Sequence, residues 1–267
     1  MIYTARAIAD VFEEIAPLSS GLPGDQLGFQ FGDPSRQIAG LACMWAVHTT
    51  SIRAAVDQGL DMFLCHEALW SDPDDSPWYA VPHEGEIVVN ELRRKLLERH
   101  SVVVYRAHSN WDALPVDGVP DQAVRALGIA GLREVAQERF FTVQELPHPM
   151  TARELRDQTA KGLGYSGCRL FGDGDQIVHR FAFLIGGFGE NQLHMPQVAR
   201  GLGAEALIIG EMSEFIVMDA LEMGLPVIET LHSVSESPAI RRQATMLAER
   251  LPGLPVRYVP SGALAFR

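Results

Sequence analysis

Four short segments of this 267-residue chain carry side chains that bind metals, and each of them follows an apolar run. They are Cys65-His66-Glu67, His108 to Asp112, Gly210-Glu211 and His232 to Glu236. Imidazole nitrogens combined with carboxylate oxygens form the ligand set that zinc, iron and manganese accept. The sequence therefore predicts one metal site assembled from segments that are distant along the chain.

Alternating helices and strands must position these segments. Helical spacing and buried apolar runs predict helices at about 4–16, 49–59, 86–99 and 121–128, and strands at 38–43, 62–65 and 101–105. Strands and helices in this order favour a largely parallel sheet, in which functional groups gather at the C-terminal ends of the strands. His66 and His108 both follow such strands.

The pattern of expected strands and helices changes in the middle of the chain, from about residue 130 to 185. We expect a strand at 140–143, a helix that opens on the capping box Thr151 to Glu154 and runs to Leu163, and a strand at 178–185. The run Gly186-Gly187-Phe188-Gly189 lacks a phosphate-loop spacing, and a tight turn is its simplest interpretation.

The order of features in the first half then recurs. Ala55 to Glu67 and Ala199 to Glu211 each contain the end of a helix, a glycine, an acid, an apolar strand and a tip ending in Glu. Each is followed by a His-x-x-x-acid pair, although the first half also carries a Trp- and Pro-rich loop from Trp70 to His83. This degenerate repeat predicts an α/β fold of two related, interlinked halves with mixed, largely parallel sheets flanked by helices. We place the halves at residues 1–130 and 131–267, with the metal site at their junction and the C-terminal helix and strand as candidates to pack back on the first half.

Six side chains are candidate metal ligands, more than the four or so that a single zinc takes. A histidine at a strand end is often only a hydrogen-bonded core residue, and helix capping alone would explain Glu236. Matching pairs in both halves favour metal binding, and carboxylates that can bridge favour two divalent ions, zinc, iron or manganese, about 3.5–4 Å apart. Glu67 and Glu211 are candidates for proton transfer. The predicted ligands are His66, Glu67, His108, Asp112, His232 and Glu236.

Bulk composition narrows the class of protein. The formal net charge is −12 and the chain has no Lys/Arg-rich run, which disfavours nucleic-acid binding. Three widely spaced cysteines indicate reduced thiols and a cytoplasmic protein rather than a disulfide framework. No apolar stretch approaches the roughly 18 residues of a membrane helix, and the N-terminal segment does not resemble a signal peptide.

In combination, these motifs resemble the NIF-three-like proteins, also called the GTP cyclohydrolase I type 2 family. The resemblance covers nearly the whole chain, and it includes Asn110 to Ala113, Gly186-Gly187, Gly210 to Glu214 and His232 to Glu236. It implies two interlinked α/β halves, a dinuclear metal site at their junction and assembly as a toroidal homohexamer. Carried over by position, the implied ligands are His66, His108, Asp112, His232 and Glu236.

The chain departs from the family pattern at one predicted ligand. Glu67 stands where the family usually has a second histidine, and Ala68 stands where it has Pro or Gly. An oxygen ligand at this position would shift the preference toward harder metals such as manganese or iron. Alternatively, Glu67 points elsewhere and one metal position is weakened.

Two classes of function follow. The first is a metal-dependent hydrolase that uses a metal-activated water on a small molecule, with a nucleotide implied by the family name. The second is a metal-binding, metal-delivery or regulatory interaction protein without turnover, since the ligand spacing fits both. An open coordination position beside a pocket of substrate size would favour the hydrolase. An α/β protein without any metal would require all the ligand segments to be coincidental.

Overall fold

The structure is a computed structural model that describes residues 2–71, 87–189, 192 and 194–261. The Trp- and Pro-rich loop predicted from Trp70 to His83 lies outside these residues from position 72 onward. The chain divides into two compact units, the first made of the described residues up to Trp111 and from Ile240 onward, the second of Asp112–Ala239. This division rests on packing and does not test the repeat, so the halves 1–130 and 131–267 stay a prediction.

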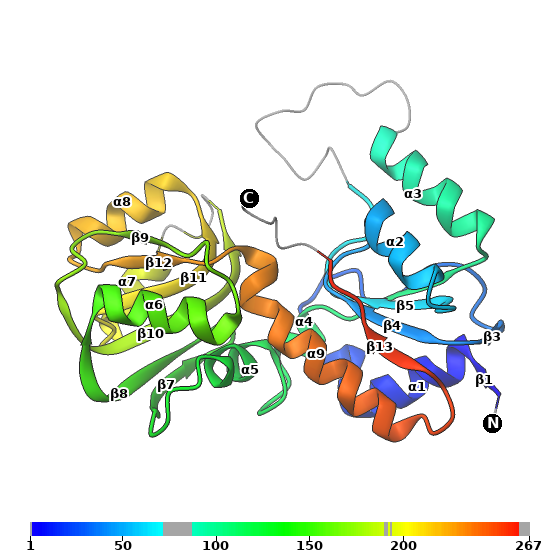
Figure 1. The fold of residues 1–267 in the computed structure, drawn as a ribbon, viewed down its shortest axis with the longest axis horizontal. Helices are drawn as coiled ribbons and strands as arrows, with labels where there is room; N and C mark the ends of the chain where they lie inside the picture. The colour runs from blue at the N-terminus through cyan, green and yellow to red at the C-terminus, as the bar shows by residue number, and fades with distance from the viewer. Residues whose placement is uncertain (1, 72–86, 190–191, 193, 262–267) are drawn as a thin grey trace. The chain divides into compact units, whose positions relative to one another are not determined.

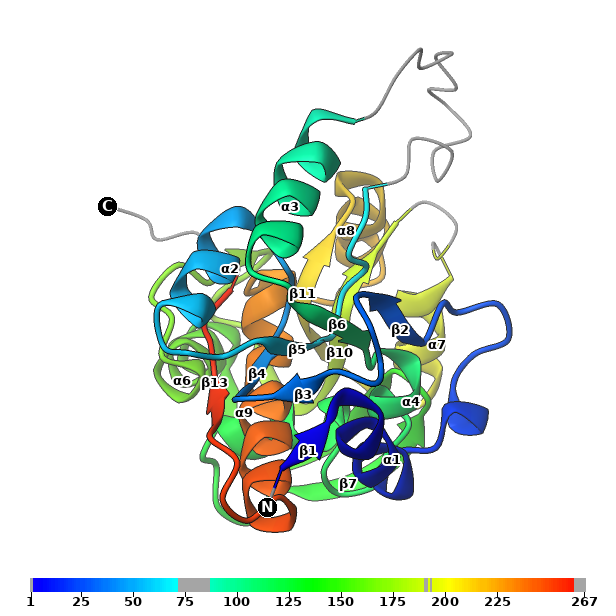
Figure 2. The same ribbon diagram turned by 90° about the vertical axis from the view of Figure 1, so that its right-hand side faces the viewer.

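The first unit contains a five-stranded sheet in the order β13-β4-β5-β6-β2, of which Figure 1 labels β13, β4 and β5. Four of its strands run parallel, and β2 is antiparallel at one edge beside β6 (Figure 2). A separate antiparallel ladder joins β1 to β3. The strand bounds are β1 Tyr3–Thr4, β2 Gly28–Phe31, β3 Gln37–Ile38, β4 Leu41–Met44, β5 Met62–Cys65, β6 Val103–Arg106 and β13 Val256–Tyr258.

Both faces of this sheet are buried, which explains why its central strands are continuous apolar runs. Alternate side chains such as Met44, Phe63 and Val104 pack under α2 and α3, which cover one face (Figure 1). On the other face, Tyr105 meets Phe12 of α1 edge to face, with ring centroids 5.8 Å apart. The helical segments of this part are α1 Ala5–Ile15, the short 3₁₀ turn η1 Leu18–Ser20, α2 Thr49–Val56, α3 Val88–Arg99 and α4 Ser109–Asp112.

The second unit contains a mixed six-stranded sheet in the order β7-β8-β10-β11-β12-β9. The three central strands β10, β11 and β12 are parallel, and the remaining pairings are antiparallel. The strand bounds are β7 Arg133–Glu138, β8 Phe141–Thr151, β9 Arg169–Phe171, β10 Ile177–Phe188, β11 Ala206–Met212 and β12 Val227–Glu229. Its helices are α5 Val119–Ala126, α6 Ala152–Leu163, α7 Met195–Gly201 and α8 Glu214–Glu222. Helix α9, His232–Arg250, begins in this unit and continues into the first.

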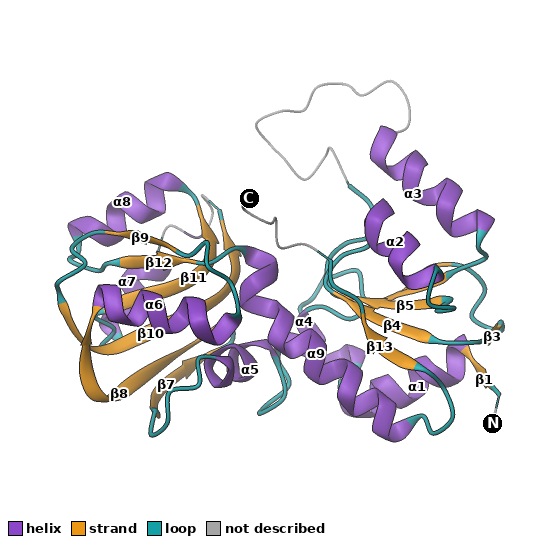
Figure 3. Ribbon diagram, viewed as in Figure 1, coloured by secondary structure: helices purple, strands orange, loops and turns teal. Residues whose placement is uncertain are grey.

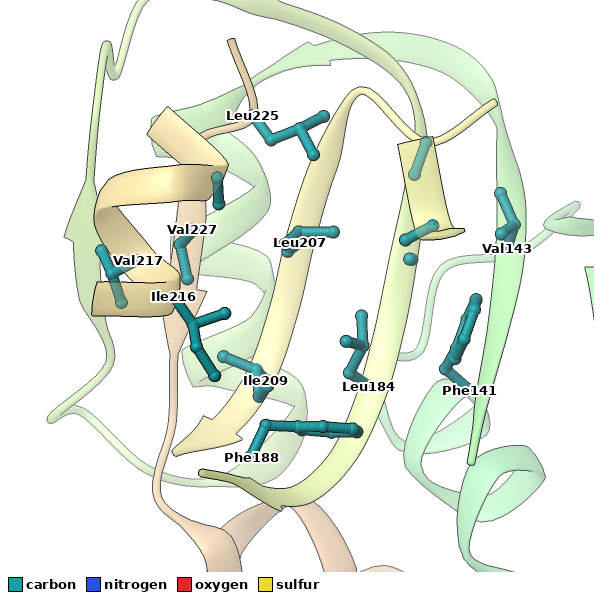
Figure 4. Packing of buried hydrophobic residues seen from close by; sticks show 14 residues of the cluster. Phe141, Val143, Leu184, Phe188, Leu207, Ile209, Ile216, Val217, Leu225 and Val227 are labelled. Carbon is teal, nitrogen blue, oxygen red and sulfur yellow. The ribbon is translucent and has the colours of Figure 1, made fainter. Parts of the chain in front are cut away.

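Helices cover this second sheet as well (Figure 3). On one face, Leu184, Leu207 and Ile209 form a cluster with side chains of α8 such as Ile216, and Phe188 closes one end of it (Figure 4). Helices α5 and α6 contact β8, β9 and β10 on their side of the sheet. The α/β architecture predicted from the sequence, with helices flanking mixed sheets, is confirmed.

Local chemistry explains the ends of several elements. The predicted capping box at Thr151 is present, since its side chain accepts the amide hydrogen of Glu154 while Glu154 accepts from Thr151 in return. The predicted glycine-rich turn is wrong, because β10 continues to Phe188 with a β-bulge between Leu184 and Gly187.

Within the described part of the chain, none of the helices combines the length and the apolar character needed to span a lipid bilayer.

Candidate metal centre

The ends of two neighbouring strands build the candidate centre in the first unit. β5 and β6 pair in parallel with Cys65 opposite Arg106, so the residues that follow them emerge at the same edge of the sheet. One ligand atom from each of His66, Glu67 and His108 lies within 4.8 Å of the others. The two imidazole rings meet at a centroid distance of 4.8 Å.

Both imidazoles in this cluster use Nδ1 for a protein hydrogen bond. The buried His66 ring places Nδ1 3.0 Å from the carbonyl oxygen of Ala107, and His108 places Nδ1 2.9 Å from a carboxylate oxygen of Asp25. An Nδ1–H that donates to an acceptor leaves the ring lone pair on Nε2. Nε2 is therefore the nitrogen that each ring would present to a metal, as in metal sites whose histidines are oriented by a second hydrogen bond.

Asp25 is the residue of this site that the sequence motifs missed. Its other carboxylate oxygen, Oδ1, accepts from Nη1 of Arg106 at 2.7 Å. Ser109 donates through both its amide and its hydroxyl to Oδ2, the oxygen that faces His108. Burial raises the pKa of Asp25, but the hydrogen bonds from His108 and Ser109 and the charges of His108 and Arg106 outweigh burial and hold that pKa well below its usual value. Asp25 is therefore a carboxylate throughout the physiological pH range.

The edge strand of the first sheet explains how Asp25 reaches His108. β2 pairs with β6 so that Gly28 lies opposite Arg106, which brings the loop before β2 to the C-terminal end of β6 (Figure 2). Arg106 also donates from Nε to the carbonyl oxygen of His66 at 3.2 Å, and the residue as a whole is buried. A single buried guanidinium thus connects the chain at His66 with the carboxylate that contacts His108.

Asp112 ends the short helix α4, four residues after His108, and is 6% exposed. It is not among the three residues whose ligand atoms lie within 4.8 Å. Its neighbour Trp111 is fully buried and packs against Phe12 at a centroid distance of 6.1 Å, so its role is packing rather than stacking on a ligand.

The second unit carries its own His–carboxylate cluster at the ends of β11 and β12. His232 begins α9, and the carboxylate of Glu236 lies 3.2 Å from its Nε2, one helical turn along. Glu211, at the end of β11, lies 3.0 Å from Nδ1 of the same ring. The imidazole is thus held on both nitrogens, by a 4% exposed Glu236 side chain and a 56% exposed Glu211 side chain.

Glycines make room for this second cluster. Gly186 has φ +70°, and a Cβ there would lie 2.8 Å from Oε1 of Glu236 and 3.0 Å from Nε2 of His232. A Cβ on Gly210 would lie only 2.2 Å from the carbonyl oxygen of Gly186. The backbone of β10 and β11 therefore approaches the His232 cluster more closely than any side chain would permit.

The donor set fits a divalent cation. The first unit offers two imidazoles whose Nδ1 atoms are already committed, together with a carboxylate, and the second offers an imidazole with adjacent carboxylates. Cys65 does not belong to this set, because it lies in the hydrophobic core and burial raises the pKa of its thiol to about 12. The ligands are nitrogen and oxygen atoms, which suit zinc, iron and manganese.

Comparison with known proteins identifies a matching family model and related proteins. The family model Duf34/NIF3 (NGG1p interacting factor 3) matches residues 3–261. A GTP cyclohydrolase 1 type 2 homolog of Clostridium perfringens is 26% identical over 254 residues, which cover 91% of each chain. The protein of the same name in Escherichia coli K12 is 31% identical over 157 residues, 59% of this chain and 61% of its own.

Solved structures agree in fold. A Bacillus cereus protein related to NIF3 superposes with a TM-score of 0.78 at 16% identity, over 99% of this chain and 98% of its own. The reduced form of HcgD from Methanocaldococcus jannaschii gives a TM-score of 0.73 at 18% identity, over 97% and 98%. At such identities the likeness shows the fold alone. Because the family model spans almost the entire sequence, the chain belongs to the Duf34/NIF3 (NGG1p interacting factor 3) family.

Proposed function

We propose that this protein is a metal-dependent hydrolase that holds two divalent ions through His66, Glu67, His108, Asp112, His232 and Glu236. The observation that carries the proposal is the cluster at the ends of β5 and β6, where three ligand atoms lie within 4.8 Å and each imidazole has its Nδ1 engaged elsewhere. A metal ligand gains basicity and a fixed orientation from such a hydrogen bond, and two neighbouring imidazoles oriented in this way beside a carboxylate support the proposal.

The chemistry that bound ions supply is a water whose pKa is lowered toward neutrality. The protein's own groups would orient the ions and move the proton. Where its carboxylate does not bind an ion, Glu67 is the candidate base in the first unit, because it lies within the three-residue cluster. Glu211 is the candidate base in the second unit. Its contact with Nδ1 of His232 supports a second role, in which Glu211 orients the His232 ring.

We propose a small-molecule substrate, with a nucleotide as the first class to test. The support is the name GTP cyclohydrolase 1 type 2 homolog carried by relatives at 26% and 27% identity. We also propose assembly as a homohexamer, as the family resemblance implies, which light scattering coupled to gel filtration would measure.

The alternative is a metal-binding or metal-delivery protein without turnover, because the same ligands serve both functions. A screen of metal-loaded protein against nucleotides and small amides, with phosphate and ammonia release measured, separates the two. The hydrolase predicts release that the His108→Ala variant loses and the His179→Ala variant keeps, since His179 pairs with Glu205 on an exposed part of β10. Metal binding without any release across the panel would favour the non-catalytic alternative.

A further inference from the structure

We infer that Asp25 is the positioning residue of the candidate centre: its carboxylate fixes His108 in the tautomer that presents Nε2 as a metal ligand. The inference rests on the proposed function for the metal itself. Its structural part, the tautomer of one imidazole, concerns the metal-free protein and can be tested without any ion.

The contacts of Asp25 allow only one hydrogen-bond arrangement. A carboxylate accepts hydrogen bonds and donates none. Oδ1 faces Nη1 of Arg106 at 2.7 Å, and Oδ2 faces Nδ1 of His108 at 2.9 Å as well as the amide of Ser109 at 3.2 Å. Since Oδ2 can only accept, Nδ1 of His108 must carry a hydrogen, and in the neutral imidazole the lone pair then lies on Nε2.

The surroundings hold the carboxylate in this orientation. The Asp25 side chain and that of Arg106 are each 10% exposed, so water competes little for their ion pair. The hydroxyl of Ser109 accepts from the amide of Leu22 at 2.8 Å while it donates to Asp25. The loop before β2 is therefore attached at two points to the segment that carries His108, and the orientation follows from the fold rather than from the presence of an ion.

An amide in place of the carboxylate would reverse the tautomer. The Asp25→Asn side chain has one oxygen, which accepts, and one NH₂ group, which donates. Arg106 needs an acceptor, and its charged hydrogen bond to position 25 is shorter than the hydrogen bond from the Ser109 amide. The carbonyl oxygen of the new side chain should therefore stay toward Arg106, which turns its NH₂ group toward Nδ1 of His108. Nδ1 must then accept, and the ring hydrogen moves to Nε2, where it blocks the nitrogen that would bind a metal.

A matched control exists in the same unit. Like Asp25, Asp61 combines backbone amide donors with an arginine: it accepts from the amides of Ala39 and Gly40 and forms an ion pair with Arg36 at 3.1 Å. It contacts no imidazole among the described residues. Asp61→Asn thus makes the same chemical change in a similar network and leaves His108 as it is.

The test is magic-angle-spinning NMR of metal-free protein labelled with [¹⁵N]histidine, at pH 8, with the His108 signals identified by their loss in His108→Ala. We expect the Nδ1–H form in the wild type and in Asp61→Asn, and the Nε2–H form in Asp25→Asn. Titration with Zn²⁺ should show a 10- to 100-fold loss of affinity in Asp25→Asn, the range expected when a group that orients a ligand is removed, and no such loss in Asp61→Asn.

Two results would overturn the inference: an Nε2–H form of His108 in the wild type, which needs no variant to fold, or an unchanged tautomer in Asp25→Asn. Equal losses of zinc affinity in both Asn variants would also contradict it, because the loss would then reflect general destabilisation. A wild-type protein that binds no metal would refute the proposed function, while the tautomer measurement would still decide the role of Asp25.

Discussion

At the residue scale, histidines in both units have Nδ1 held by a protein acceptor. His66 uses a backbone carbonyl, His108 uses Asp25 and His232 uses Glu211. The sequence motifs identify these histidines because each follows an apolar strand. They do not identify Asp25, which lies in a Gly- and Pro-containing loop 83 positions before His108 and reaches it only through the pairing of β2 with β6. The four-residue β2 had no recognisable pattern of its own, so nothing in the sequence pointed to that pairing.

Glu67 gives a prediction about metal preference. A carboxylate favours manganese or iron relative to the imidazole that the family usually carries there, so Glu67→His should raise the affinity for Zn²⁺ relative to Mn²⁺ on the order of tenfold. Competition between the two ions, followed by calorimetry, measures the ratio. Glu98→His, on the exposed face of α3, is the control. An unchanged ratio in Glu67→His would mean that this side chain does not bind the metal.

At the element scale, the parallel strands were the most predictable part of the fold. β5 occupies the predicted residues 62–65, and the predicted helix from Thr151 to Leu163 matches α6 because its capping box is a local signal. The edge strands β2, β7 and β9 were not predicted, since they are short or partly exposed and have no clear pattern in the sequence. The glycines at the end of β10 were misinterpreted as a turn because sequence alone does not show that two strands and His232 converge on them.

That convergence predicts the effect of a single methyl group. Gly210→Ala would place Cβ 2.2 Å from the carbonyl oxygen of Gly186, so β10 and β11 must move apart. We expect a loss of about 2 kcal/mol or more in the free energy of unfolding, together with weakened metal binding at His232. Chemical denaturation measures the first effect.

The control for this variant is Gly201→Ala. Gly201 lies in α7, and no neighbouring atom lies within 4 Å of the position that a Cβ would occupy there, so alanine should be neutral or stabilising by about 0.5–1 kcal/mol. A Gly210→Ala protein as stable as Gly201→Ala would show that β10 and β11 are not packed as closely as described.

At the scale of the whole molecule, the three cysteines are free thiols buried in the fold, as their spacing predicted. Burial raises the pKa of Cys43 above its usual range, that of Cys65 to about 12 and that of Cys168 to about 11. At neutral pH very little of each thiol is ionised, so the reactivity of these cysteines as nucleophiles is suppressed in the native protein.

A thiol-labelling experiment checks this. At pH 8 a disulfide reagent such as DTNB should react slowly with the native protein and with all three thiols once guanidinium has unfolded it. Cys168, at 6% exposure, should react first during partial unfolding. Rapid native labelling of Cys65 would contradict its burial beside the candidate centre and would reopen the question of a thiolate ligand.

The central claim is that His108 and His232 each hold a metal. The most direct measurement is the metal content, by inductively coupled plasma mass spectrometry, of the wild type, His108→Ala, His232→Ala and the control His179→Ala, each purified without added metal. We predict up to two ions per chain in the wild type and the control, and a clear loss in both site variants while their circular dichroism spectra remain native. Unchanged metal content in both His108→Ala and His232→Ala would contradict the account.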